Sequence, residues 1–74
     1  MIPEEFELRA KIKREETGDT INIYALKMKY GPKGIIWRGI LKCLEEEMEK
    51  KDDKIVKQAY QNAINHVKQI LGII

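Results

Sequence analysis

The 74-residue chain contains no serine, one cysteine and one histidine, so it has few of the side chains from which catalytic sites are built. A serine nucleophile is excluded outright, and Cys43 lies at the edge of an apolar helical stripe, where a thiol packs rather than reacts. His66 lies at the flank of a second stripe, and we expect it to pack half-exposed. The sequence therefore predicts no catalytic residue and a protein that is not an enzyme.

The sequence also has few residues suited to a metal-binding or phosphate-binding site. A metal site needs several convergent ligands, but the carboxylates of residues 45–53 follow no recognised ligand spacing. The segment 31–34, Gly-Pro-Lys-Gly, lacks the spacing of a phosphate-binding loop, and Pro32 removes one backbone donor from it. We predict no metal, no cofactor and no small-molecule substrate.

Long apolar runs and signal-peptide features are also missing. No run approaches the roughly 20 apolar residues of a membrane-spanning helix, and residues 1–5 have neither a basic start nor an apolar stretch. Cys43 has no partner for an internal disulfide, as is usual in a reducing compartment. We therefore expect no membrane association and a cytoplasmic location. Lysine, glutamate and isoleucine dominate, which resembles a thermophile composition.

Acidic residues stop early in this chain, because none follows Asp53. Residues 1–31 carry no net charge and residues 32–53 carry −1, so residues 54–74 hold a surplus of +3. The same segment holds five of the six amide side chains: Gln58, Gln61, Asn62, Asn65 and Gln69. This acid-free, amide-rich segment is the most unusual feature of the sequence.

The first half of the chain predicts a β-hairpin. Apolar and charged residues alternate over about 5–14, which is the period of a half-buried strand. Turn residues around Gly18 then precede a β-branched and aromatic run over about 20–30, the second strand. Ile21 and Ile23 are out of phase with the later apolar residues. We expect either a bulge just after them or an exposed apolar spot suited to a partner.

The second half predicts two antiparallel helices, over about 33–50 and 54–71. Apolar residues recur three and four apart in both, an aspartate precedes the second helix as a cap, and Gly72 ends it. Two glycines in the first helix, Gly34 and Gly39, indicate that another element approaches closely. The fold class is therefore α+β: a single ββαα domain, residues 1–74, whose hairpin and two helices share one core.

Charge placement along the 33–50 helix opposes the helix dipole. Four glutamates lie in its last turns, where cations are favoured: Glu45, Glu46, Glu47 and Glu49. We predict that they pair with lysines or arginines from elsewhere, and Arg9, Lys11 and Lys13 are the nearest supply.

Two surfaces have a composition suited to nucleic acid. The first is a basic stretch around Tyr30 and Trp37, although Trp37 belongs to the apolar stripe, so burial competes with base stacking. It comprises Lys27, Lys29, Lys33 and Arg38. The second is the outer face of the 54–71 helix, where amides suit base edges and lysines suit phosphates. It comprises Lys54, Lys57, Gln58, Gln61, Asn62, Asn65, Lys68 and Gln69.

Three interpretations of this helix face remain open: a solvated surface, a contact with another subunit, or a nucleic-acid interface. The first functional hypothesis is a small non-enzymatic binding protein that recognises nucleic acid. The alternative is a protein–protein interaction or structural module, including a homodimer. A two-stranded hairpin is marginal alone, so we expect pairing across a dimer to cover its edges and the apolar tail at Ile73 and Ile74.

Overall fold

The computed structural model describes residues 5–17, 20–32 and 34–73. Over these ranges the elements are α1 (Glu5–Glu15), β1 (Glu16–Thr17), β2 (Thr20–Ile21), α2 (Ile23–Tyr30), α3 (Gly34–Glu49) and α4 (Lys54–Leu71). The predicted ββαα order with two helices is therefore wrong. The described part of the chain is mostly helical, with four helices and a small hairpin.

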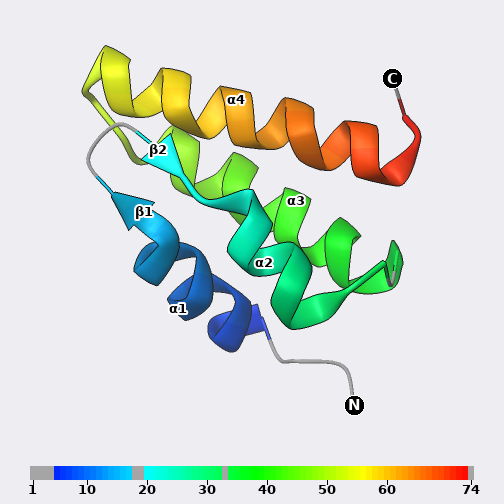
Figure 1. The fold of residues 1–74 in the computed structure, drawn as a ribbon. Helices are drawn as coiled ribbons and strands as arrows, with labels where there is room; N and C mark the ends of the chain where they lie inside the picture. The colour runs from blue at the N-terminus through cyan, green and yellow to red at the C-terminus, as the bar shows by residue number, and fades with distance from the viewer. Residues whose placement is uncertain (1–4, 18–19, 33, 74) are drawn as a thin grey trace.

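The helices pack in an order that leaves α4 at one edge of the molecule. α3 and α4 run antiparallel and lie along each other, while α1 packs on α3 (Figure 1). α2 contacts both α1 and α4, and β2 also lies against α4. α4 is thus covered on one side by α3, α2 and β2, and the side facing away from them carries its exposed residues.

The predicted first strand is the helix α1. Leu8 and Ile12, four residues apart, are its buried residues, whereas Phe6 is 66% exposed. The alternating pattern contained this helical spacing, because every fourth position also belongs to a period of two. Glutamate, leucine, arginine, alanine and lysine favour helices, and Arg9–Glu5 is an i,i+4 ion pair. Local propensity and packing both favour the helix.

Most of the predicted second strand is the helix α2. The Asn22 side chain accepts a hydrogen bond from the backbone N–H of Ala25 at 3.2 Å and so caps the helix start. Gly31 ends the helix at φ 63°, a conformation that glycine adopts readily. Ile23 and Leu26, three residues apart, are the buried positions. Asn22 as an N-cap and Gly31 as a C-cap were the sequence signals that could have predicted this helix.

The expected hairpin is reduced to one pair of two-residue antiparallel strands, with Glu16 opposite Ile21. Gly18 lies outside the described residues. Ile21 and Ile23 are both buried, so the expected bulge and the expected exposed apolar spot are both wrong. Strands of two residues also leave little edge for the expected pairing across a dimer to cover.

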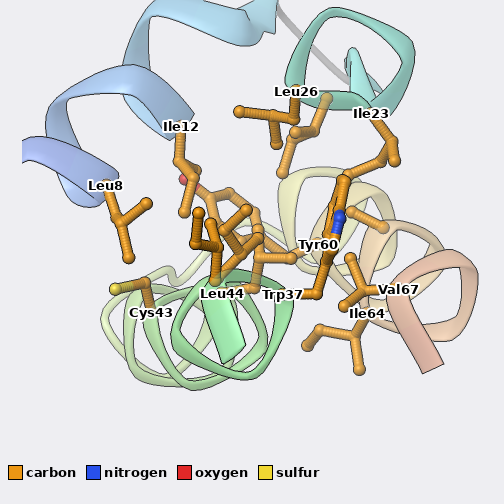
Figure 2. Close-up of a cluster of buried hydrophobic side chains, with 14 residues drawn as sticks. Leu8, Ile12, Ile23, Leu26, Trp37, Cys43, Leu44, Tyr60, Ile64 and Val67 are labelled. Atoms are coloured by element: carbon orange, nitrogen blue, oxygen red, sulfur yellow. The ribbon is translucent and has the colours of Figure 1, made fainter. Parts of the chain in front are cut away.

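The core combines side chains from all four described helices. Trp37 and Tyr60 are fully buried at its centre, with apolar side chains around them (Figure 2). The Trp37 indole N–H also donates to the Gly31 carbonyl at 2.6 Å, which links α3 to the end of α2. The core stripe residue Trp37 is therefore not exposed for base stacking. The other fully buried large side chains are Ile12, Leu26, Ile40, Leu44, Val67 and Cys43.

The close approach expected at the α3 glycines occurs at one of them. A Cβ at Gly39 would lie 3.0 Å from Leu8 Cδ1, so α1 packs directly on this turn of α3. Nothing lies within 4 Å of the equivalent position at Gly34. The approaching element is the helix α1.

The predicted pairing of the α3 glutamates is confirmed for Glu46 and Glu47, whereas Glu45 and Glu49 have no ion-pair partner among the described residues. The Arg9 guanidinium donates to Glu46, to Glu47 Oε1 at 3.1 Å and to Glu5 Oε1 at 2.7 Å. Lys50 Nζ lies 3.4 Å from the same Glu47 oxygen. Burial alone would raise the pKa of Glu47, but the hydrogen bonds from Lys50 and Arg9 outweigh it and hold the pKa below its ordinary value. This cluster joins α1 to the end of α3.

Candidate nucleic-acid interface

α4 is a well-delimited helix that presents the acid-free segment. The Asp53 carboxylate accepts from the Ile55 N–H at 2.8 Å and caps the start. Gly72 ends the helix in the left-handed conformation at φ 74°, and its N–H donates to the Gln69 carbonyl at 3.1 Å. Both signals were predicted, and the helix spans Lys54–Leu71 as the pattern indicated.

The amide–lysine face of α4 lies opposite its buried residues. Lys54, Lys57, Gln58, Asn62, Asn65 and Gln69 are exposed, and Gln61 and Lys68 are half-buried. The buried residues of the helix are Ala59, Tyr60, Ala63, Ile64 and Val67. The structure therefore brings together all eight α4 residues predicted for the interface on one accessible side of the helix.

Two hydrogen bonds between amides order this face. Gln58 Nε2 donates to Asn62 Oδ1 at 2.9 Å, and Gln61 Nε2 donates to Asn65 Oδ1 at 3.0 Å. Each bond joins residues four apart, the spacing at which helical side chains meet. The amide groups of Asn62 and Asn65 have no further partner in the described part of the chain, so both can donate to another molecule.

The basic stretch predicted before α3 does not form one surface. Lys27 and Lys29 would share a face of a strand, but in α2 they are two residues apart and point to different sides. Lys27 Nζ lies 5.5 Å from the centre of the Tyr24 ring, whose edge meets the His66 ring of α4 at 5.8 Å. Lys29 instead lines a hollow between α1 and α2. Only Lys27 of this pair joins the α4 side.

The remaining two residues of that stretch are Lys33 and Arg38. Lys33 lies outside the described residues. Arg38 is exposed on α3 and has no ion-pair partner among the described residues. Lys27 and Lys29 thus do not share a face of α2, and a surface that joins Arg38 to either of them stays a prediction.

The ion pairs of the described residues lie away from the α4 face. They connect α1, β1, α3 and residues 50–51, and none includes Lys54, Lys57 or Lys68. The nearest is Lys51 Nζ, 3.5 Å from Glu16 Oε1. Within the described part of the chain, the three α4 lysines thus keep their positive charge without an acidic partner.

Shallow hollows flank the amides. One, of about 350 Å³, is lined by Lys54, Ile55, Gln58, Ala59 and Asn62. Another, of about 380 Å³, lies on the other side of Lys54 and Gln58, and Met48 of α3 and Gln61 also line it. The face is therefore a ridge of amides and lysines with a depression on each side.

A third hollow, which the sequence did not predict, lies between β2 and α4, and His66 is one of its lining residues. The predicted half-buried position of His66 at the flank of the helix is what the structure shows. Its neighbours could not be predicted, because β2 and α2 were assigned to one long strand. Ala59 and Ala63, small residues four apart in an otherwise bulky stripe, were the available signal.

Catalytic and metal-binding groups do not gather in the described residues. Cys43 is fully buried, and its burial raises the pKa of the thiol, which disfavours the reactive thiolate. No group of three or more His, Cys, Asp or Glu residues stands close enough to hold a metal ion in this part of the chain. None of the described helices is long and apolar enough to cross a membrane.

Comparison with known proteins adds no family: no family model, curated protein or solved structure matches this chain.

Proposed function

We propose that this chain is a small, cytoplasmic, non-enzymatic protein that binds nucleic acid through the amide–lysine face of α4. The observation that carries this proposal is an exposed helix face with three cations, no carboxylate and two ordered amide pairs. The reduced, buried state of Cys43 supports the cytoplasmic location.

Charge placement supports a polyanionic partner. Arg9, Lys11 and Lys50 form ion pairs with four carboxylates of α1 and α3, whereas the α4 lysines have no acidic partner among the described residues. The paired carboxylates are Glu5, Glu15, Glu46 and Glu47. Cations left unpaired on an exposed face attract phosphates, whose binding releases condensed counterions. Phosphates can therefore bind to these lysines without breaking any ion pair among the described residues.

The helix geometry supports contact with bases as well as phosphates. α4 has 18 residues, and at about 1.5 Å per residue it extends for roughly 27 Å along one edge of the molecule. Side-chain amides pair with base edges, and the hydrogen bonds to Asn62 and Asn65 favour one orientation of each amide, which reduces the entropy lost on binding.

Titration with duplex and single-stranded DNA at low salt, followed by backbone amide chemical shifts, tests the proposal. We expect shifts confined to the outer face of α4 and an affinity that falls as salt rises. Replacing Lys54, Lys57 and Lys68 together by Gln should lower the slope of log affinity against log salt by about 0.9 for each lost phosphate contact on duplex DNA. Lys13→Gln, at an exposed site on α1, is the control. An absence of shifts on α4 would reject the proposal.

Self-association is a second candidate, favoured by exposed apolar side chains. Met28 is 90% exposed and Tyr24 is 69% exposed, one turn apart on α2, and Ile55 of α4 is 64% exposed. Ile73 of the expected apolar tail is 58% exposed, and Ile74 lies outside the described residues. Light scattering at several concentrations tests this candidate, and a mass that stays at one chain at every concentration would reject it.

A further inference from the structure

A hollow of about 160 Å³ lies where β2 and the start of α2 meet α4. Ile21 and Ile23 line it from one side, and Ala59 and Ala63 line it from α4. These alanines are one helical turn apart on the same side of α4, so their small side chains leave space between the helix and β2. The floor of this hollow, called here the β2–α4 hollow, is apolar.

The rim of the β2–α4 hollow is polar, and no carboxylate is among the described residues that line it. Thr20, Asn62 and His66 complete its lining. The bond from Gln58 to Asn62 Oδ1 fixes the Asn62 amide and leaves its NH₂ group as a donor. The His66 ring is held edge to face against Tyr24, at 5.8 Å and 76°. Both rim groups on α4 are thus oriented by a neighbouring side chain.

The size and chemistry of the hollow limit its ligand. Its volume of about 160 Å³ is well below the roughly 300 Å³ at which pockets for drug-sized molecules begin, so it holds one ring system. An apolar floor suits the face of a flat ring, and an amide with an imidazole suits a ring edge that carries donors and acceptors. A nucleobase has both properties.

Cations stand on two sides of the β2–α4 hollow. On α2, Lys27 lies over the Tyr24 ring, which in turn contacts His66. On α4, the neighbouring depression shares Ala59 and Asn62 with the hollow and reaches Lys54. A nucleic-acid strand with one base in the hollow would therefore have a lysine near the phosphate on each side of that base.

We infer that the β2–α4 hollow receives one unpaired base of a single-stranded nucleic acid, while Lys27 and Lys54 contact the neighbouring phosphates. The inference rests on the proposed function and specifies its partner. A base inside a duplex is stacked and paired, so it enters such a hollow only after being flipped out at a cost of a few kcal/mol. The site therefore favours single strands over duplexes.

The test compares the affinity of the full chain for a short labelled single strand and for its duplex, by fluorescence anisotropy at low salt. Ala63→Leu fills the hollow without changing charge, and Ala10→Leu makes the same change at an exposed site on α1. His66→Ala removes part of the rim at a half-buried site. It is the second test variant, to be used if circular dichroism shows that Ala63→Leu does not fold.

We expect the unmodified chain and Ala10→Leu to bind the single strand about tenfold more tightly than the duplex, the size of one base contact. Ala63→Leu and His66→Ala should lose this preference and bind the duplex as before. Three results would overturn the inference and leave the α4 proposal standing. The first is that the unmodified chain binds single strand and duplex with equal affinity, and the second is that both variants keep the preference for the single strand. The third is that a mononucleotide binds as tightly as the strand. Binding of neither nucleic acid would reject both.

Discussion

The α1–α3 side of the molecule and the α4 side use their charges in opposite ways. Between α1 and α3, Arg9 and Lys50 surround the buried Glu47, so cations and carboxylates hold two helices together. On α4, lysines and amides line an exposed face, and its hydrogen bonds join amide to amide. The difference indicates that charge serves packing on one side and remains for a partner on the other.

Removing Arg9 is expected to have the largest effect on this comparison. Arg9→Leu leaves Glu47, whose side chain is 4% exposed, with Lys50 as its only ion-pair partner among the described residues. Because a buried carboxylate that loses one of its two cation partners is less well compensated, the free energy of unfolding should fall by about 1–3 kcal/mol in urea denaturation. Arg14→Leu, at an exposed site on the same helix, should change it by less than about 0.5 kcal/mol. Equal effects would contradict the assigned role of the cluster.

Acid should weaken the α1–α3 side through Glu47. Its pKa in the folded chain lies below the ordinary value of 4.5, so its contribution to stability is present above pH 4.5 and is lost as pH falls toward the folded-state pKa. Urea denaturation at a series of pH values from neutral downward measures this loss. Arg9→Leu should show a smaller loss than the unmodified chain over that range, and an identical profile would count against the ion cluster as its source.

The Tyr60 hydroxyl connects the two sides, because it donates from α4 to the Glu16 carboxylate in β1. Burial, followed by this hydrogen bond and the charge of Glu16, raises the pKa of Tyr60 above its ordinary value of 10.0. Stability from this group is therefore full below pH 10.0 and is lost as pH rises beyond it. Tyr60→Phe should lower the free energy of unfolding by about 1 kcal/mol at neutral pH and remove the alkaline loss.

Thermal and urea unfolding of Tyr60→Phe check this prediction, with Tyr24→Phe as the exposed control. Tyr24 has no hydrogen-bonded hydroxyl among the described contacts and is 69% exposed, so its variant should match the unmodified chain. A Tyr60→Phe variant with an unchanged alkaline profile would show that the hydroxyl does not connect the two sides.

The amide pairs of α4 should contribute least to stability. Asn62→Ala and Asn65→Ala each remove one exposed i,i+4 hydrogen bond, worth about 0.2–0.5 kcal/mol, and alanine's higher helix propensity offsets part of this loss. The free energy of unfolding should therefore change by less than about 0.5 kcal/mol in each variant. A loss above about 1 kcal/mol would mean that the amides are structural, and it would weaken the view that this face is left for a partner.

The two C-terminal helices could be predicted from the sequence, and the N-terminal ones could not. In α4, a long amphipathic pattern, the Asp53 cap and the Gly72 stop agree with one another. In α1, a pattern of alternating residues is compatible with both a strand and a helix, because Leu8 and Ile12 satisfy either period. Short elements give periodicity too few turns to distinguish these cases.

The candidate site divides in the same way. The exposed α4 residues were predictable because a helical wheel separates them from the buried stripe. The separation of Lys27 from Lys29 followed from α2 being a helix, and the β2–α4 hollow followed from the packing of β2 on Ala59 and Ala63. The hollow involves residues of separate elements, so no local pattern predicts it, whereas the separation of Lys27 from Lys29 required only the correct assignment of residues 23–30 as a helix.

By itself, the sequence determined the helical C-terminal half, the acid-free face of α4 and the need of the α3 glutamates for cations. These are properties of residues within a few helical turns, where spacing and local charge decide the outcome. The tertiary structure alone decided that residues 5–15 and 23–30 are helices, that Arg9 supplies the cation, and that a hollow borders α4. Each of these depends on side chains from distant segments meeting, because burial against α3 and α4 selects among local conformations of similar stability.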